Sequence, residues 1–104
     1  MTKNEINYII NKTFKEMSES KIPWISDLYE AYAHEFNTFA DNFANDKISY
    51  EECYRGKKLL KLQYFYKFIN GKKKHKLSIT WEEKIVIGHI MTPSDEITIY
   101  SSLL

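Results

Sequence analysis

The chain has 104 residues, of which 43% are hydrophobic and 15% aromatic, and its formal net charge is only +1. This composition excludes a disordered chain, and the length predicts one domain, residues 1–104, that folds without a metal or a disulfide. A single cysteine excludes an intrachain disulfide. No apolar run approaches the roughly 20 residues of a membrane span, and Lys3, Asn4 and Glu5 do not begin a signal peptide. We therefore expect a soluble, cytoplasmic protein that binds no membrane.

Two long helices are predicted in the first 44 residues. Thr2 and Glu5 form a capping box before apolar residues at helical spacing, and the residue before Pro23 disfavours helical dihedral angles, so the first helix should cover residues 2–20. Pro23 suits the first turn of a second helix, which covers residues 24–44. The apolar stripe of this helix contains Trp24, Ile25, Leu28, Tyr32, Phe36, Phe39 and Phe43, and its polar side carries Asp27, Glu30, Glu35 and Asp41. We expect the stripe to form the centre of the core and the acidic side to be solvated rather than to imitate DNA phosphates.

A third helix begins clearly, but its end is ambiguous. Ser49 and Glu52 form a second capping box, and Ile48 and Cys53 stand where a hydrophobic staple belongs. Gly56 could end this helix after two turns, which predicts a short helix over residues 49–55. Alternatively, the helix continues to Asn70-Gly71.

Residues 59–69 decide between these alternatives. As a helix they scatter apolar side chains around the axis, whereas as a strand they alternate between apolar and polar. Asn70-Gly71 is the strongest short signal for a β-hairpin. Pairing across that turn places Leu62 opposite Ile79, Tyr64 opposite Leu77 and Leu60 opposite Trp81, so both strands agree about which face is apolar. We therefore prefer the hairpin to the long helix.

The remaining sequence predicts two further strands. Lys84–Met91 should be a strand after a turn at Glu82-Glu83, Thr92–Asp95 should be a turn, and Ile97–Tyr100 should be the last strand. The predicted fold class is α+β: two long helices and a short one, in residues 1–56, pack on an antiparallel β-meander of about four strands, in residues 57–104.

Basic side chains are concentrated in the second half of the chain. Residues 1–52 carry a charge of −5 and residues 53–104 a charge of +6, with nine bases and no acid between Cys53 and Trp81. Like charges that face one another at the hairpin tip destabilise it, so contact with an anionic partner explains them, although lysines also protect sheet edges from aggregation. The candidate partner-binding residues are Lys61, Phe65, Tyr66, Lys67, Lys72, Lys73, Lys74, His75 and Lys76.

Catalytic and cofactor-binding patterns are absent from the sequence. Cys53 stands at an apolar position typical of a core residue rather than a nucleophile. Glu30 and His34 are an i, i+4 pair without a third metal ligand at a recognisable spacing. The adjacent carboxylates of Glu82 and Glu83 should point apart into solvent. We therefore expect no enzyme, no cofactor and no metal.

Three functions remain in different classes. The first is a small non-enzymatic protein, such as an inhibitor from a phage or mobile element, that docks through the basic, aromatic-rich hairpin on a host protein or nucleoprotein with an anionic surface, for example a defence nuclease. The second is direct DNA or RNA binding of low specificity by the same hairpin, since lysine outnumbers arginine fourteen to one. A winged helix is a variant of it, although Glu51 and Glu52 would repel phosphate at the recognition helix. The third is an immunity protein for a toxin.

Overall fold

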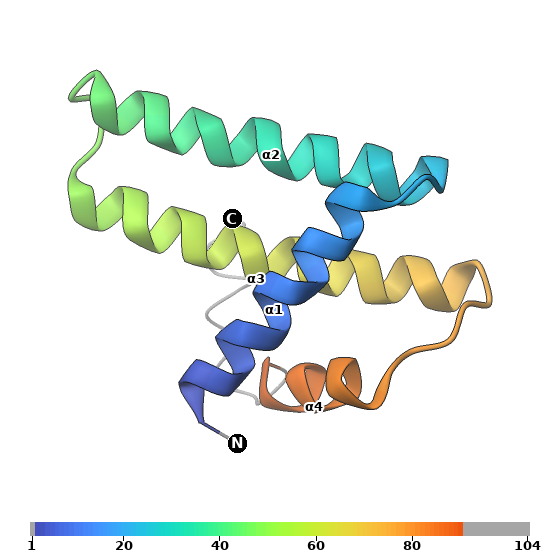
Figure 1. The fold of residues 1–104 in the computed structure, drawn as a ribbon. Helices are drawn as coiled ribbons and strands as arrows, with labels where there is room; N and C mark the ends of the chain where they lie inside the picture. The colour runs from blue at the N-terminus through green and yellow to red at the C-terminus, as the bar shows by residue number, and fades with distance from the viewer. Residues whose placement is uncertain (1, 91–104) are drawn as a thin grey trace.

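Four helices make up the part of the chain that the computed structural model describes, residues 2–90. They are α1 (Lys3–Glu19), α2 (Pro23–Ala44), α3 (Tyr50–Lys74) and α4 (Trp81–Ile90). α2 and α3 lie side by side and antiparallel, α1 crosses both of them, and α4 lies beyond α3 at the N-terminal end of α1 (Figure 1). Residues 2–90 contain no strand, so the predicted α+β fold is wrong, and so is its division into a helical part and a β-meander.

The predicted beginnings of the first three helices are confirmed. The Thr2 hydroxyl oxygen accepts the Glu5 backbone N–H at 3.2 Å, and the Ser49 hydroxyl oxygen accepts the Glu52 backbone N–H at 3.1 Å. Each of these bonds satisfies an N–H group that a helix start leaves without an intrahelical partner. Pro23 is the first residue of α2, where its missing N–H costs nothing.

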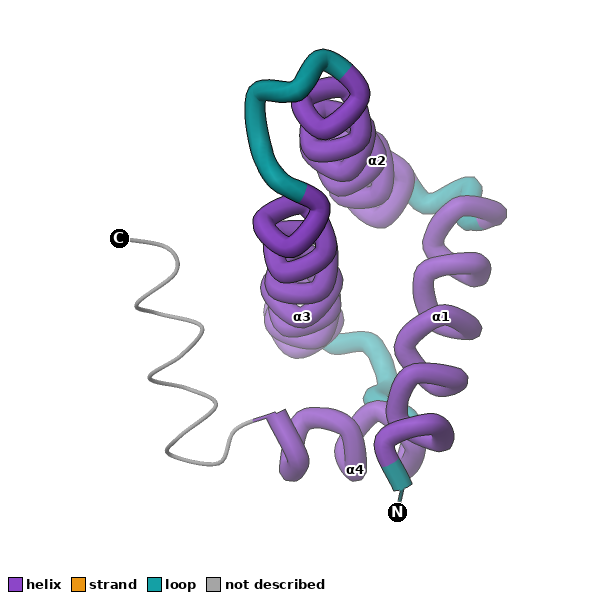
Figure 2. Tube along the Cα trace, turned by 90° about the vertical axis from the view of Figure 1, so that its left-hand side faces the viewer, coloured by secondary structure: helices purple, strands orange, loops and turns teal. Residues whose placement is uncertain are grey.

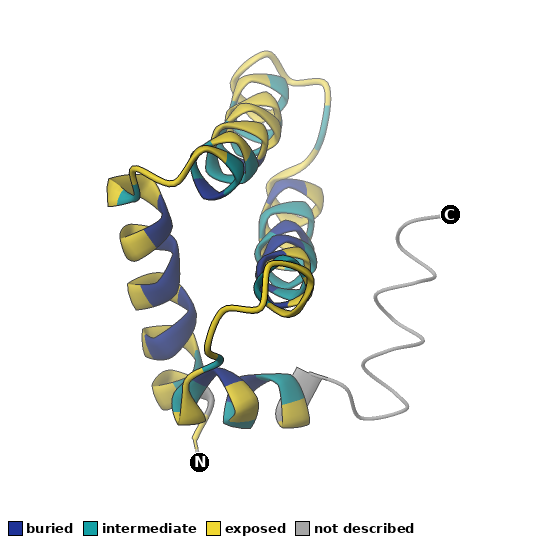
Figure 3. Ribbon diagram, turned by 90° about the vertical axis from the view of Figure 1, so that its right-hand side faces the viewer, coloured by how far each residue is buried: buried dark blue, intermediate teal, exposed yellow. Residues whose placement is uncertain are grey.

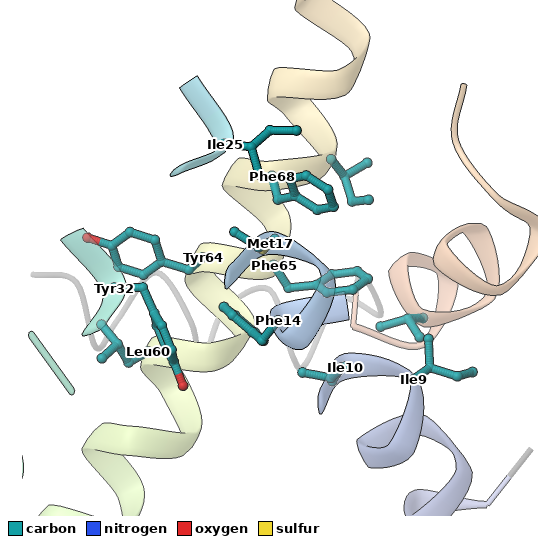
Figure 4. Packing of buried hydrophobic residues seen from close by; sticks show 12 residues of the cluster. Ile9, Ile10, Phe14, Met17, Ile25, Tyr32, Leu60, Tyr64, Phe65 and Phe68 are labelled. Atoms are coloured by element: carbon teal, nitrogen blue, oxygen red, sulfur yellow. The ribbon is translucent and has the colours of Figure 1, made fainter. Parts of the chain in front are cut away.

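The core lies where α1, α2 and α3 meet and extends to α4. Phe65 is its most enclosed aromatic side chain, with an exposed fraction of 0%. Figure 4 shows Phe65 of α3 among apolar side chains of α1, with Tyr32 of α2 and Tyr64 of α3 beside them. α3 contributes six buried side chains, Cys53, Leu60, Tyr64, Phe65, Phe68 and Ile69, whereas α2 contributes Ile25 and Tyr32. We had predicted that the second helix forms the centre of the core. That prediction is wrong, because α3 forms the centre.

The central position of α3 explains why the hairpin prediction is wrong. α3 contacts α1, α2 and α4, so it buries side chains on several sides (Figures 2 and 3). A helix enclosed in this way carries apolar residues around much of its circumference. The scattered apolar groups of residues 59–69 follow from this burial, and their alternation is incidental. The third helix therefore does not end at residue 55, and the winged-helix variant, which needs the same hairpin, fails as well.

Two glycines that looked like helix ends are positions of close helix packing. Gly56 faces the ring of Phe39, and Gly71 faces the ring of Trp24. A Cβ atom would stand 2.3 Å from Phe39 Cε1 at Gly56 and 2.4 Å from Trp24 Cζ3 at Gly71. Neither glycine has a positive φ. The absence of a side chain, and not conformational freedom, is therefore what α3 uses at these two positions.

α4 replaces the predicted turn at Glu82-Glu83 and the strand that should follow it. Its first turn contains Glu83, whose backbone N–H donates to the Thr80 hydroxyl at 3.1 Å, while Glu83 Oε1 accepts the Thr80 backbone N–H at 3.0 Å. This reciprocal pair is a complete capping box. The described residues 84–90 are therefore helical. The predicted turn at Thr92–Asp95 and strand at Ile97–Tyr100 lie outside the described residues.

Candidate binding surfaces

The lysines at the C-terminal end of α3 form one exposed basic cluster. Lys73 and Lys74 belong to the last turn of the helix, and Lys76 follows in the loop, in the left-handed region at φ 57°. We call these three residues the basic end. His75 caps the helix beside them, and its ring stacks on that of Trp24 at 4.8 Å between centroids. Four of the nine candidate residues therefore lie together.

Lys72 is engaged inside the protein. Its Nζ donates to Glu83 Oε1 at 2.7 Å and lies 4.9 Å from the centre of the Phe68 ring. The side chains of Lys72 and Glu83 are 15% and 5% exposed. The pair holds the first turn of α4 against the last turn of α3, so Glu83 is a structural residue and not a solvated one as we had expected.

The other candidate residues do not join the basic end. Phe65 is fully buried and offers no surface to a partner. Tyr66 is half-buried, and Lys67 is exposed with its Nζ 4.6 Å from the centre of the Tyr64 ring. Lys61 lies on another part of α3, where its Nζ donates to Asn11 Oδ1 at 3.2 Å.

The sequence analysis placed Trp81 opposite Leu60 on the apolar face of the predicted hairpin, whereas the structure exposes it. It is 73% exposed, the largest exposed fraction among the exposed large apolar side chains of residues 2–90. Lys84 is exposed one turn further along α4, and Leu77 is exposed in the loop that follows the basic end. Since Glu83 is bound to Lys72, the start of α4 is held beside the last turn of α3. We call Trp81, Leu77, Lys84 and the basic end together the Trp81 surface.

A second surface is a groove between α1 and α3, with a volume of about 410 Å³. Lysines of α3 line one side of it, and asparagines of α1 line the other. We call it the lysine–asparagine groove. Its polar lining residues are Asn4, Asn7, Asn11, Tyr54, Lys57, Lys58 and Lys61. No signal in the sequence points to this groove, because it depends on how α1 crosses α3.

Exposed aromatic rings lead from the loop between α2 and α3 to that groove. Phe43 and Tyr50 meet edge to face at 5.8 Å between ring centroids, and Tyr50 and Tyr54 stack at 6.4 Å. We call these three residues the aromatic ladder. Tyr54 belongs both to the ladder and to the lining of the groove.

Cys53 is buried, as expected of a core residue, with its Sγ 3.5 Å from the Phe39 carbonyl oxygen. Among the described residues, no three His, Cys, Asp or Glu side chains gather into a group that could hold a metal ion. None of the helices in residues 2–90 is both long and apolar enough to span a membrane.

No protein-family model, no curated protein and no solved structure matches this chain. The function is therefore inferred from the chemistry of the surface.

Proposed function

We propose that this is a non-enzymatic binding protein that docks on a partner protein with an anionic surface, through the Trp81 surface. The observation that carries the proposal is the exposure of Trp81, with the exposed Lys84 one turn away on α4 and the last turn of α3 held against the start of α4 by the Lys72–Glu83 pair. A tryptophan buries a large apolar area when it enters a partner's pocket, and tryptophan is enriched among the residues that dominate binding energy. Lysines around such an anchor attract an acidic partner and raise the association rate.

The surroundings of Trp81 are suited to this role. Glu82, its acidic neighbour in α4, lies 3.7 Å from Lys12 Nζ, so its charge is partly compensated. The charged residues that define the Trp81 surface are lysines, and the carboxylate of Glu16 lies nearby on α1, where it lines a small hollow with Thr80 and Glu82. The first turn of α4 is fixed by the Lys72–Glu83 pair and by the capping box, so Trp81 stands on an ordered element. An anchor that is already ordered loses little conformational freedom on binding.

Sequence-specific reading of DNA has less support. Arg55 is the chain's one arginine, and its Nη2 donates to Glu51 Oε1 at 2.8 Å. Arginine is the residue best suited to bidentate contacts with guanine and phosphate. The proposed biological setting is a phage or mobile element, in which this protein inhibits a host protein or nucleoprotein.

The proposal is tested by affinity capture with the full chain as bait, with and without nuclease, followed by mass spectrometry. We expect a protein that survives nuclease treatment and that is lost when the bait carries Trp81→Ala. Charge reversal at Lys73, Lys74 and Lys76 should slow association with the isolated partner, with a strong dependence on salt. Retention of the partner by both variants would refute the assignment of this surface.

A matched control separates this effect from a general loss of positive charge. Lys15, Lys21 and Lys47 are exposed lysines outside the Trp81 surface. Their triple change to Glu alters the net charge by the same amount as the reversal of the basic end. Capture by this control should be unchanged, and equal losses in the two triple variants would mean that only net charge matters.

A further inference from the structure

The lysine–asparagine groove has a lining that suits an anionic ligand. Lys57, Lys58 and Lys61 line it from α3, and no carboxylate lines it. Lys58 is exposed and makes no ion pair within residues 2–90. Lys57 Nζ lies 4.7 Å from the centre of the Phe36 ring and makes no ion pair within residues 2–90. The groove therefore holds positive charge that the described part of the protein does not neutralise.

The opposite wall offers hydrogen bonds in both directions. Asn4, Asn7 and Asn11 lie three and four residues apart, which places them on one side of α1. Each amide has a donor and an acceptor group, the combination that reads the edge of a nucleobase. Asparagine is among the poorer helix formers, so the stability of α1 does not account for three of them on one face. Of these amides, that of Asn11 already accepts a hydrogen bond from Lys61.

The ring of Tyr54, which lines the groove, and that of Tyr50, which stacks on it, offer flat surfaces. Tyr50 and Tyr54 are 68% and 58% exposed, and their rings are inclined by only 22° to each other. Glu51, in the same turn of α3, is held at 2.8 Å by Arg55, so this acid is neutralised by its neighbour. Tyrosine rings beside unpaired lysines supply the two contacts that single-stranded nucleic acid needs, base stacking and phosphate pairing.

We infer that the lysine–asparagine groove, together with the aromatic ladder, binds single-stranded nucleic acid, and that this site is separate from the Trp81 surface. Lys57, Lys58 and Lys61 hold the phosphates, and a base stacks on Tyr54. A duplex is a poorer ligand because its bases are already stacked and paired. An acidic peptide could pair with the lysines but has no flat rings to stack on the ladder.

The test is fluorescence anisotropy with a labelled twelve-nucleotide oligothymidine at several salt concentrations. Three phosphate contacts predict a slope of about −2 for log K against log salt. Tyr54→Ala should weaken binding by about 5- to 150-fold, whereas Tyr54→Phe, which keeps the ring, should bind like the wild type. Changing Lys58 and Lys61 to Ala should reduce the slope to about −0.7. Tyr54 and Lys58 are exposed, and the fold of every variant is checked by its far-UV circular dichroism and melting temperature.

Controls distinguish this site from other anion-binding surfaces. Changing Lys73, Lys74 and Lys76 to Ala should alter the affinity by less than about threefold in physiological salt. Lys58 and Lys73 are fifteen residues apart on α3, which is about 22 Å and well beyond the screening length of about 8 Å. The inference is overturned if Tyr54→Ala binds normally, if the basic-end variant alone loses binding, or if polyglutamate or the duplex competes as well as the single strand.

Discussion

Adding a methyl group to Gly71 should destabilise the protein even though alanine is the better helix former. In an exposed helix interior, Gly→Ala raises stability by about 0.8–1 kcal/mol. At Gly71 the new Cβ would stand 2.4 Å from Trp24 Cζ3, far below the 3.5–4.0 Å of an ordinary carbon–carbon contact. Trp24 is held by its stacked contact with His75 and by Phe68, so its ring cannot move away freely.

The size of the effect follows from comparison with a third glycine. A Cβ at Gly88 meets no atom within 4 Å, so Gly88→Ala should give only the gain in helix propensity. Overpacking costs about 1–3 kcal/mol. The free energy of unfolding of Gly71→Ala should therefore lie about 1–3 kcal/mol below that of Gly88→Ala. For a domain of this size, each 1 kcal/mol corresponds to about 4–8 °C in melting temperature.

Urea unfolding followed by far-UV circular dichroism measures this difference. A double-mutant cycle adds the cause: in a Trp24→Leu background, Gly71→Ala should lose most of its cost, because the ring that it meets is gone. Gly56 and Phe39 provide an independent repeat of the same experiment. If Gly71→Ala and Gly88→Ala stabilise the protein equally, close packing of α2 on α3 at this position is refuted.

Three further predictions concern the ion pair, alkaline stability and helix content. Lys72→Met should reduce the free energy of unfolding by about 3 kcal/mol, because Glu83 would remain buried and charged. The double variant, Lys72→Met with Glu83→Gln, should recover part of that loss. Equal stability of the single and the double variant in urea would contradict a buried pair. Burial raises the pKa of Tyr32 from the ordinary 10.0 to about 12, and the charge of Tyr29 adds a smaller effect. The pKa of Tyr64 is also raised from 10.0 to about 12, mainly by burial and to a smaller extent by a hydrogen bond to Glu35 and the charge of that carboxylate. Because the unfolded chain loses these protons first, the stability that each neutral tyrosine gives is fully present below pH 10 and is lost as the pH rises towards 12. Tyr→Phe at either position should therefore make alkaline unfolding less steep. The four helices contain 74 residues of a chain of 104, so circular dichroism should report at least about 70% helix. A value near 40–45%, as expected for the α+β fold, would refute the long α3.

The beginnings of helices could be predicted from the sequence, because they depend on neighbouring residues. Thr2, Ser49 and Pro23 each mark a helix start in the structure. Thr80 with Glu83 carries the same signal, but we interpreted it within a predicted β-meander and missed it. The end of α3 was harder to predict, since Asn70-Gly71 has the sequence of a hairpin turn but the surroundings of a helix packed against Trp24.

The candidate site was predictable only as far as it is contiguous in sequence. The basic end was found because Lys73, Lys74 and Lys76 follow one another closely. The groove was missed because it joins Asn7 of α1 to Lys58 of α3, and only the crossing of the two helices brings them together. Phe65 was assigned to a partner because the predicted strand placed it at a surface, whereas the structure encloses it completely.

The charge distribution along α3 has a consequence for any experiment on its lysines. Glu51 and Glu52 lie in the first turn of α3, and Lys72, Lys73 and Lys74 lie in its last. Each end of α3 therefore carries side-chain charges opposite in sign to the partial charge of the helix macrodipole there. Each well-placed charge of this kind stabilises the helix by about 0.3–1 kcal/mol at low ionic strength. The lysines of the basic end therefore stabilise the helix even without a partner. A variant that neutralises or reverses them weakens the end of α3 as well as the contact, and the free energy of unfolding of the unbound protein measures the first effect separately from the second.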